Sequence, residues 1–342
     1  MSSTTQKGQH EPGAHSSRAN QYRPEIDGLR AFAVIAVIAN HMNPHILPSG
    51  YLGVDIFFVI SGFVITASML ASSHTNLRLF LTNFYSRRAR RLLPALLVFI
   101  LITSLLICLV NPTPADTLLT GMSALFGGSN LYLMQRSADY FAPSTQLNAF
   151  THTWSLGVEE QFYFLFPLLL GTAGLWRNNA PAHRRTQSRL GWIIFALSGL
   201  SLLGFLALYK SQTAAVYFLM PFRFWELGFG CILAIVNLRF IQIFKHVDHF
   251  HGPLSLLVFT ALITTFFAPE RLATQATVLA VVLTCMLIAF VAKGSFVYKL
   301  LTHRISLWIG TISYSLYLWH WSILSLSNWT VGIHAWTVPF QG

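Results

Sequence analysis

The sequence predicts an all-α protein that crosses a membrane many times as a helical bundle. Of its 342 residues, 54% are hydrophobic and only 10% are charged, whereas about 25% of the residues in an ordinary soluble domain are charged. A chain of this length cannot enclose so much apolar surface in one core. A bilayer removes that requirement because the lipid is itself an apolar solvent. These observations exclude a soluble globular domain.

Nine apolar stretches approach the roughly 20 residues that a helix needs to cross the hydrocarbon layer. A tenth stretch, 117–135, is interrupted by the Gly-Gly-Ser-Asn run 127–130. The seventh of the nine is short, so its length does not fix its ends or its tilt. The nine predicted spans lie at about 29–46, 52–71, 92–111, 154–176, 190–209, 214–238, 253–268, 272–292 and 305–326.

The basic residues predict how the chain is oriented, because Lys and Arg concentrate in short cytoplasmic loops. An even number of spans must separate the arginines at 87–91 from those at 177–189, so 117–135 is expected to be re-entrant or interfacial. Irregular backbone at that depth has to be covered by protein or line a water-filled cavity. The N-terminus is then predicted to be cytoplasmic, and we expect a multi-pass protein of the inner (plasma) membrane. A third cytoplasmic group consists of Lys293, Lys299 and Arg304.

Three segments follow from this reading. Residues 1–21 are polar and lack the apolar core of a signal peptide, which predicts a disordered cytoplasmic tail. Residues 22–330 form the membrane domain, and 331–342 form an extracytoplasmic end.

The net charge of +11 fits orientation signals better than nucleic-acid binding. The basic residues lie in short loops between apolar stretches and not along one amphipathic face. The cysteines lie inside apolar runs with no pairing or metal-ligand spacing, so the sequence indicates neither a disulfide framework nor a zinc site. They are Cys108, Cys231 and Cys285.

The first predicted helix carries an arginine and a histidine at a helical spacing. Arg30 and His41 are eleven positions apart, so at about 100° per residue they lie within roughly 20° of each other on one stripe. At 1.5 Å rise per residue, His41 is about 16 Å deeper than Arg30. One helix face is therefore predicted to link the cytoplasmic surface to the middle of the membrane. The alternative is that Arg30 only anchors the helix and His41 is an interfacial residue before Pro44.

Two further segments place polar residues at the first spans. Asp55 lies near the outer end of the second span, where it is expected to serve a polar cavity or a helix N-terminus, because ionisable groups in spans are costly and usually functional. Ser61 and Gly62 are small enough to let helices approach closely. Whether this packing role alone accounts for both residues is left open by the sequence. Four arginines mark the cytoplasmic mouth of the third span, where guanidinium groups suit either nucleotide phosphates or anionic lipid. They are Arg87, Arg88, Arg90 and Arg91.

The later spans add a second set of candidates. Glu159 and Glu160 follow His152 at the start of an apolar helix, where the helix dipole explains one carboxylate. Because adjacent residues point about 100° apart, at least one of the two is expected to face the bundle interior. Arg223 and Glu226 are one turn apart, which predicts a structural ion pair. In the last span His320 follows Tyr317 by three positions and is either a hydrogen-bonded partner or a site residue.

In this order the motifs resemble the acyltransferase family 3 integral membrane proteins, which modify cell-envelope carbohydrates. The resemblance covers about residues 22–326. The final run is similar to that of members with a further span and an extracytoplasmic SGNH-type domain. The family plan has ten spans, so the nine expected here predict a truncated unit that ends at Gly342. The resemblance rests on the Arg30 to His41 spacing, the run 55–63, the arginines at 87–91, the run 154–163 and the run 313–320.

This resemblance implies an O-acyltransferase that moves an acyl group, most often acetyl, from cytoplasmic acyl-CoA to a hydroxyl of a glycan or lipid-linked sugar. The acceptor could be peptidoglycan, lipopolysaccharide O-antigen, an exopolysaccharide or a glycolipid. No metal is implied. Arg30 and the arginines at 87–91 would bind the donor phosphates. His41 would act as general base on the acceptor hydroxyl, or would carry the acyl group covalently.

The same resemblance implies roles for the remaining candidates. Glu159 or Glu160 would orient a histidine or the sugar. The acceptor side would be lined by Asp55, His152, Tyr317 and His320.

A proton-coupled exporter or flippase would also need Arg, His and Glu on surfaces that face the bundle interior. Such a transporter usually shows paired halves with broken helices, and the sequence shows no internal repeat. A non-catalytic scaffold would have little reason to bury His41 and two glutamates.

Overall fold

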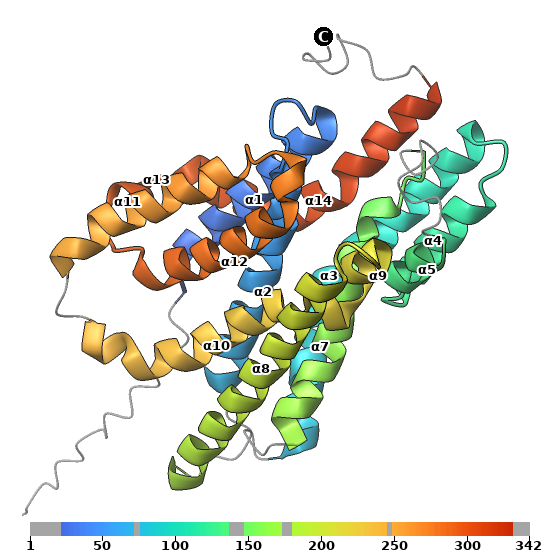
Figure 1. Cartoon of the computed structure of the whole chain (residues 1–342). Coiled ribbons are helices and arrows are strands. Elements are labelled where there is room, and N and C mark those ends of the chain that lie inside the picture. Colours follow the sequence, from blue (N-terminus) through green and yellow to red (C-terminus); the bar gives the residue numbers. More distant parts are fainter. Residues whose placement is uncertain (1–21, 72–75, 137–146, 173–179, 245–247, 331–342) are drawn as a thin grey trace, which may run out of the picture.

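The computed structural model describes residues 22–71, 76–136, 147–172, 180–244 and 248–330, and Figure 1 shows them as helices joined by loops. No β-strand occurs within these ranges, so the prediction of an all-α bundle is confirmed. The α-helices are α1 (Pro24–Met42), α2 (Gly53–Ala71), α3 (Leu77–Val110), α4 (Ala115–Leu125), α5 (Ser129–Gln135), α7 (Trp154–Thr172), α8 (Ala180–Leu208), α9 (Thr213–Phe218), α10 (Met220–Phe244), α11 (Asp248–Thr265), α12 (Ala273–Phe290), α13 (Phe296–Leu301) and α14 (Arg304–Thr330). Short 3-10 turns are η1 (Gly50–Leu52), η3 (Thr151–Thr153) and η4 (Glu270–Leu272).

The predicted tail, residues 1–21, and the predicted extracytoplasmic end, residues 331–342, lie outside the described residues. So does Arg177 of the second basic group.

By length and hydropathy alone, five helical segments of the described chain are long and apolar enough to cross a membrane, and Gly252–Thr265 is a shorter apolar helix. The predicted spans α1, α7 and α14 are not among them, because polar side chains interrupt their apolar runs. These three helices carry half of the candidate site residues, including both His41 and His320. The count of nine spans stays a prediction. The five segments are Gly50–Ala71, Leu77–Val110, Gln187–Leu208, Thr213–Val236 and Glu270–Phe290.

The third predicted span begins much earlier than expected. α3 is 34 residues long and starts at Leu77, which makes it about 50 Å long at 1.5 Å per residue. Its start is fixed by Asn76, whose side chain accepts a hydrogen bond of 2.8 Å from the Leu79 amide, as an N-cap does. The arginine cluster therefore lies on the same continuous helix as the apolar stretch that follows it.

Two other stretches are broken helices. The stretch 117–135 divides into α4 and α5 around Gly127, whose φ of 66° favours glycine, so the predicted interruption is confirmed. The stretch 214–238 was expected to be one helix, and it breaks at Leu219, where ψ is 130°. Pro221 follows in the first turn of α10, a position that tolerates its missing N–H. Asn130 satisfies the carbonyl left free at Phe218 with a hydrogen bond of 2.9 Å.

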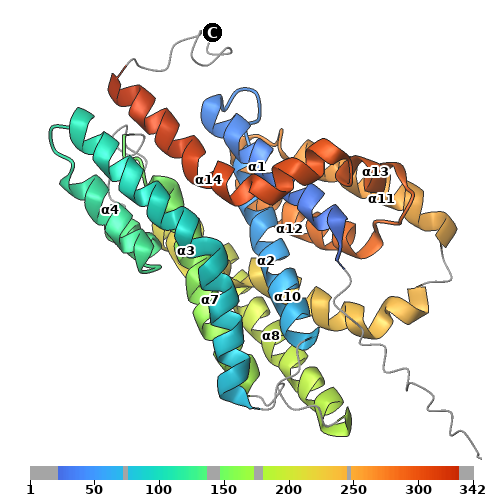
Figure 2. The ribbon, with the colours of Figure 1, turned by 180° about the vertical axis from the view of Figure 1, so that it is seen from behind.

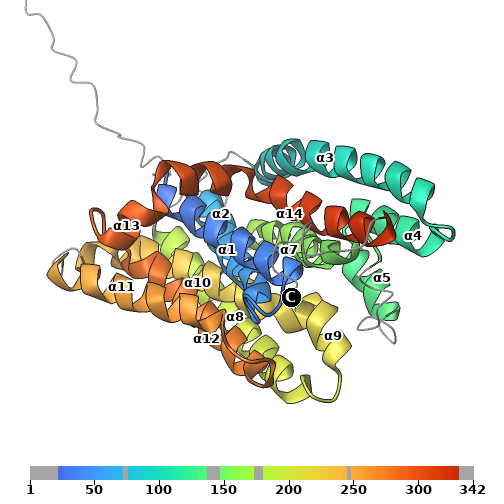
Figure 3. The same cartoon turned by 90° about the horizontal axis from the view of Figure 1, so that it is seen from above.

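The helices α1 and α2 lie between two groups, with α11, α12 and α13 on one side and α3, α7, α4 and α5 on the other (Figures 1 and 3). α2 packs along α10, and α1 packs along α14. Viewed from behind, α14 crosses α1 and runs from the α13 side toward α3 and α4 (Figure 2). α14 therefore contributes to both groups.

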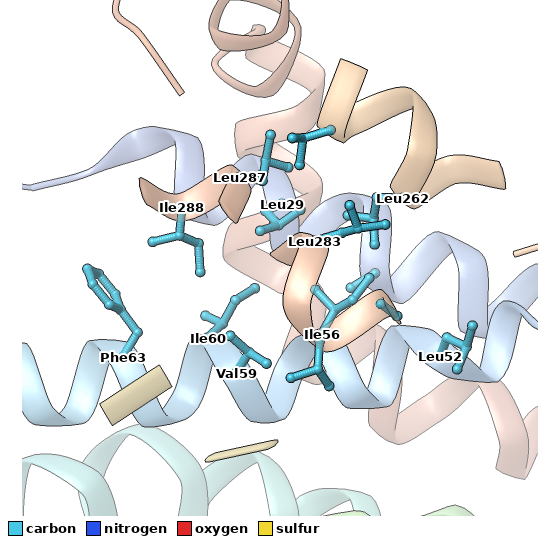
Figure 4. Packing of buried hydrophobic residues seen from close by; sticks show 14 of the residues in the cluster. Leu29, Leu52, Ile56, Val59, Ile60, Phe63, Leu262, Leu283, Leu287 and Ile288 are labelled. Atoms are coloured by element: carbon cyan, nitrogen blue, oxygen red, sulfur yellow. The ribbon is translucent and has the colours of Figure 1, made fainter. Parts of the chain in front are cut away.

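The main apolar core joins α1 and α2 to α11 and α12. Leu29, Ile56, Val59, Leu262 and Leu283 come from these four helices and point toward one another (Figure 4). Burying one such side chain contributes about 1.5–3 kcal/mol relative to leaving it in water. In lipid that term disappears, so close packing of the helices has to supply the association energy.

Glycines provide that close packing where helix backbones touch. A Cβ added at Gly62 on α2 would overlap the Leu227 carbonyl on α10, and one added at Gly230 would overlap the Val59 carbonyl. At the other main crossing, Gly310 of α14 lies against the Asp27 carbonyl of α1. The pairing of α2 with α10 and of α1 with α14 thus depends on residues without side chains.

We expect Gly62→Ala to lower the thermal unfolding temperature of the purified protein, because the new methyl group would push α2 away from α10 at a cost of about 1–3 kcal/mol. Gly199→Ala on α8 is the control, since nothing lies within 4 Å of its added Cβ. The control should be neutral or slightly stabilising, because alanine is the better helix former. Equal effects of the two substitutions would contradict the close-packing account.

Candidate active site

A pair of histidines lies where α1 meets α14. The Nδ1 atom of His41 is 2.9 Å from the Nε2 atom of His320. The two rings are nearly parallel, with an interplanar angle of 4° and centroids 5.2 Å apart. The Trp321 indole packs edge-on against His41 at a centroid distance of 4.8 Å. The sequence predicted each histidine separately, and the structure makes them direct partners.

Buried groups from α14 and η3 surround the pair. The Nδ1 atom of His320 lies 2.7 Å from the Tyr317 carbonyl oxygen, and the Tyr317 hydroxyl donates to the His152 carbonyl at 3.0 Å. The same hydroxyl is 2.7 Å from Ser155 Oγ. The His152 ring lies 5.4 Å from the His320 ring, centroid to centroid.

The three histidines differ in accessibility. His152 and His320 are buried, at 3% and 8% exposed, whereas His41 is half-buried. His41 is therefore the most exposed histidine of the cluster. Among the described residues, no group of three His, Cys, Asp or Glu side chains has the arrangement needed to hold a metal ion.

Arg30 lies on the same side of α1, nearer its N-terminus. Its guanidinium is 3.7 Å from the Asp27 carboxylate, and it interacts electrostatically with Glu159 and Tyr163 of α7 and with Arg91 of α3. Arg30 therefore faces α3 and α7, and His41, on the same stripe of α1, faces α14. The predicted shared face of this helix is present in the structure.

Asp27 also holds Tyr22, which lies two positions before the start of α1. The Tyr22 hydroxyl donates to Asp27 Oδ2 at 2.7 Å, and this hydrogen bond, together with partial burial, raises the pKa of Tyr22 to about 12. The phenol therefore remains protonated, and remains a donor, throughout the physiological pH range.

The α3 arginines form a cationic edge beside Arg30. Arg88 is half-buried, and its guanidinium lies 5.0 Å from the centre of the Tyr163 ring, a cation–π contact. The other three, Arg87, Arg90 and Arg91, are exposed. Arg91 and Arg30 are close enough to repel each other electrostatically. Such a grouping of like charges favours an anionic ligand between them.

Glu159 is held at this edge and not beside the histidines. Its carboxylate accepts hydrogen bonds from Ser61 at 2.9 Å and from Tyr163 at 2.5 Å, and it interacts electrostatically with Arg88 and Arg30. Tyr163 follows Glu159 by four positions, so a helical reading of this segment could have identified the pair. For Ser61 the sequence left open whether packing alone explains it, and the structure makes its hydroxyl a hydrogen-bond donor to Glu159.

Glu160 occupies a different place. It lies against Gly127, the turn between α4 and α5, where an added Cβ would come 2.6 Å from Glu160 Oε2. Gln161 ties the same turn to α7 by donating to the Gly127 carbonyl at 3.1 Å and to Asn130 Oδ1 at 2.8 Å. The two adjacent glutamates thus face different sides, as their spacing predicts.

Asp55 belongs to a separate buried charge cluster. Arg223 Nη1 lies 3.0 Å from Asp55 Oδ1 and 2.6 Å from Glu226 Oε1, so the predicted pair of Arg223 with Glu226 is present. The guanidinium also lies 5.4 Å from the Trp154 ring and 5.5 Å from the Tyr217 ring. All three charged side chains are at most 6% exposed. A role for Asp55 in substrate binding stays a prediction.

Residues 23–340 match the protein family described as Acyltransferase domain. The chain belongs to this family. Over 323 residues it is 33% identical to the peptidoglycan O-acetyltransferase OatA of Listeria monocytogenes, an alignment that covers 91% of this chain and 50% of that protein. Over 319 residues it is 32% identical to the O-acetyltransferase OatA of Staphylococcus aureus, with 90% and 51% covered. The chain spans about half the length of these curated relatives. No solved structure matches it.

Replacing Arg223 by Met should lower the free energy of unfolding by roughly 3–5 kcal/mol, because the Asp55 and Glu226 carboxylates would lose their buried cation. A titration with denaturing detergent that follows helical circular dichroism measures the effect. The control is Arg136→Met, since Arg136 and Asp116 form an ion pair of 2.8 Å whose side chains are 60% and 67% exposed. Exposed pairs of this kind contribute about 0–1 kcal/mol. Losses of equal size would mean that the buried cluster is not held by charge.

Proposed function

We propose that this protein is an integral membrane O-acyltransferase that moves an acyl group, normally acetyl, from cytoplasmic acyl-CoA to a hydroxyl of a cell-envelope glycan. The N-terminus of the chain is cytoplasmic in this proposal, and the membrane is the plasma (inner) membrane. The relatives named as O-acetyltransferases favour acetyl as the group and peptidoglycan as the first acceptor to test.

The single observation that carries the proposal is that a half-buried imidazole and an arginine lie on one stripe of α1, and that this arginine lies beside the cationic edge on α3. His41 is half-buried and bonded to His320, while Arg30 stands eleven residues earlier beside the α3 arginines. A donor with phosphates at one end and a thioester at the other needs both features. The arginines hold the phosphates at the membrane surface, and the imidazole meets the thioester deeper in the membrane.

In the donor site, Arg30, Arg88 and Arg91 bind the phosphates of CoA, and Arg87 and Arg90 add exposed positive charge. Guanidinium groups suit this task because each offers paired N–H donors in a fixed fork. Glu159 positions the arginines, since it interacts with Arg30 and Arg88 and is itself fixed by two hydrogen bonds.

In the transfer step, His41 takes the proton of the acceptor hydroxyl as that oxygen attacks the thioester carbonyl. The C–O bond forms, the C–S bond of the tetrahedral intermediate breaks, and the imidazolium returns its proton to the departing CoA sulfur. General base catalysis of this kind contributes about 10²–10⁴-fold. The covalent version forms an acyl-imidazole on His41 first and then transfers the acyl group to the sugar.

The groups on the acceptor side would be His152, Tyr317 and His320, which cluster around His41, and Glu160, which lies beside the α4–α5 turn. Asp55 is further from this cluster in its contacts, and its proposed role is to fix α2 against α10 through Arg223.

We expect His41→Ala to reduce acetyl transfer by at least 10²-fold. The assay uses purified protein in liposomes with radiolabelled acetyl-CoA and peptidoglycan disaccharide fragments, and it measures CoA release and labelled sugar. His45→Ala is the control, because His45 is exposed in the loop after α1. Wild-type transfer by His41→Ala would remove the proposed base, and movement of unmodified glycan without CoA release would support the exporter instead.

Arg88→Gln and Arg91→Gln should each raise the KM for acetyl-CoA by about 10-fold or more, because a charge-assisted hydrogen bond is worth roughly 1.5–3 kcal/mol. The kcat should change less, since the chemistry takes place at His41. Lys210→Gln removes one positive charge from an exposed position between α8 and α9 and serves as the control. An unchanged KM in both arginine variants would assign these side chains to anionic lipid.

A further inference from the structure

We propose that His320 is a positioning residue that fixes His41 in the tautomer with the proton on Nδ1, so that the Nε2 atom of His41 is the atom that acts on the substrate. This inference rests on the proposed function. It specifies which ring atom reacts and which neighbour makes it reactive.

The donor and acceptor roles in the two hydrogen bonds of His320 follow from the Tyr317 carbonyl. A carbonyl oxygen can only accept, so the Nδ1 atom of His320, at 2.7 Å from it, must carry the proton. In a neutral imidazole one nitrogen is a donor and the other an acceptor. The Nε2 atom of His320 therefore presents a lone pair. Its partner at 2.9 Å, His41 Nδ1, must then be the donor.

The geometry of the two rings suits this hydrogen bond. Their planes are parallel to within 4°, and their centroids are 5.2 Å apart although the bonded nitrogens are only 2.9 Å apart. Rings stacked face to face would not combine these values. The rings instead lie edge to edge in a common plane, where the N–H of one points along the lone pair of the other.

The surroundings keep the pair neutral. Among the described residues, the titratable groups that face His41 and His320 are His152 of η3 and Tyr317 of α14. His320 is the titratable neighbour that acts on His41, and carboxylates and guanidinium groups make no described contact with either ring. A charged imidazolium without a counter-ion is costly in a buried apolar site. The resting pair therefore follows the neutral pattern set by Tyr317.

The consequence lies on the opposite edge of His41. With the proton held on Nδ1, the Nε2 atom has a free lone pair, and Trp321 holds the ring edge-on at 4.8 Å. When Nε2 takes the acceptor proton, the Nδ1 proton can shift toward His320 and share the charge. The proton on Nε2 then passes to the CoA sulfur, and both rings return to their starting tautomers.

The experiment compares three substitutions of His320. His320→Gln can place an amide oxygen near the position of Nε2, His320→Asn is chemically matched but too short to reach it, and His320→Leu removes the acceptor. We expect kcat for acetyl transfer to fall about 10²-fold or more in the variants His320→Leu and His320→Asn. The kcat of His320→Gln should be at least 10-fold higher than that of His320→Asn. The dissociation constant of acetyl-CoA should stay within 2-fold of wild type in all three.

The outcomes separate this inference from the proposed function. If Gln and Asn give the same kcat, or if Leu keeps the wild-type kcat, His320 does not set the tautomer, even when His41→Ala is inactive. If His41→Ala itself transfers acetyl, the proposed function fails first. If His320→Leu does not fold, the comparison of kcat between His320→Gln and His320→Asn still tests the role of His320, because both variants bury a neutral amide at the same position.

Discussion

The approach of α1 to α14 is the constraint on which the rest of the structure depends. Gly28 lets α1 touch the Leu301 carbonyl at the end of α13, and Gly310 lets the backbones of α1 and α14 touch at the Asp27 carbonyl. This contact brings His41 within hydrogen-bonding distance of His320. A wider crossing would leave two isolated imidazoles in an apolar interior, where unpaired polar groups are costly. The close crossing of α1 and α14 is therefore required for the hydrogen bond between the two histidines.

The polar residues of the bundle are accommodated in three different ways: by hydrogen bonding, by ion pairing and by exposure at an edge of the bundle. The histidine cluster is joined by hydrogen bonds, whereas Arg223 pairs with both Asp55 and Glu226 and lies against aromatic rings. The arginines of α3 remain at an open edge, where solvent and ligands can reach them. Each arrangement avoids leaving an unpaired charge in lipid. Only the third leaves charge available for binding.

Much of the fold and part of the candidate site could be predicted from the sequence, because the helical spacing of residues and their hydropathy are local properties of the chain. The spacing of Arg30 and His41 fixed their shared face, and the Gly127 break was visible as a run of small polar residues. The partnership of His41 with His320 was not predictable, since 279 positions separate them and spacing along a helix says nothing about a distant helix. The contact of Glu159 with Ser61 also depended on how α7 is rotated against α2. The split at Leu219 was missed because proline can begin a helix as well as interrupt one.

The length of α3 has a mechanical consequence. One helix carries Arg88 and Arg91 on its first half and Phe99, which packs against the His152 ring, on its second. Pro94 lies between these two parts of α3. Because proline cannot donate the backbone hydrogen bond of its position, bending the helix there costs less free energy than bending it elsewhere. The first half is held against α7, where the Tyr85 hydroxyl donates to the Phe164 carbonyl at 2.8 Å, and the second half is held against the histidine cluster through Phe99. A single proline thus separates the part of the helix that carries the arginines from the part that packs against the histidines.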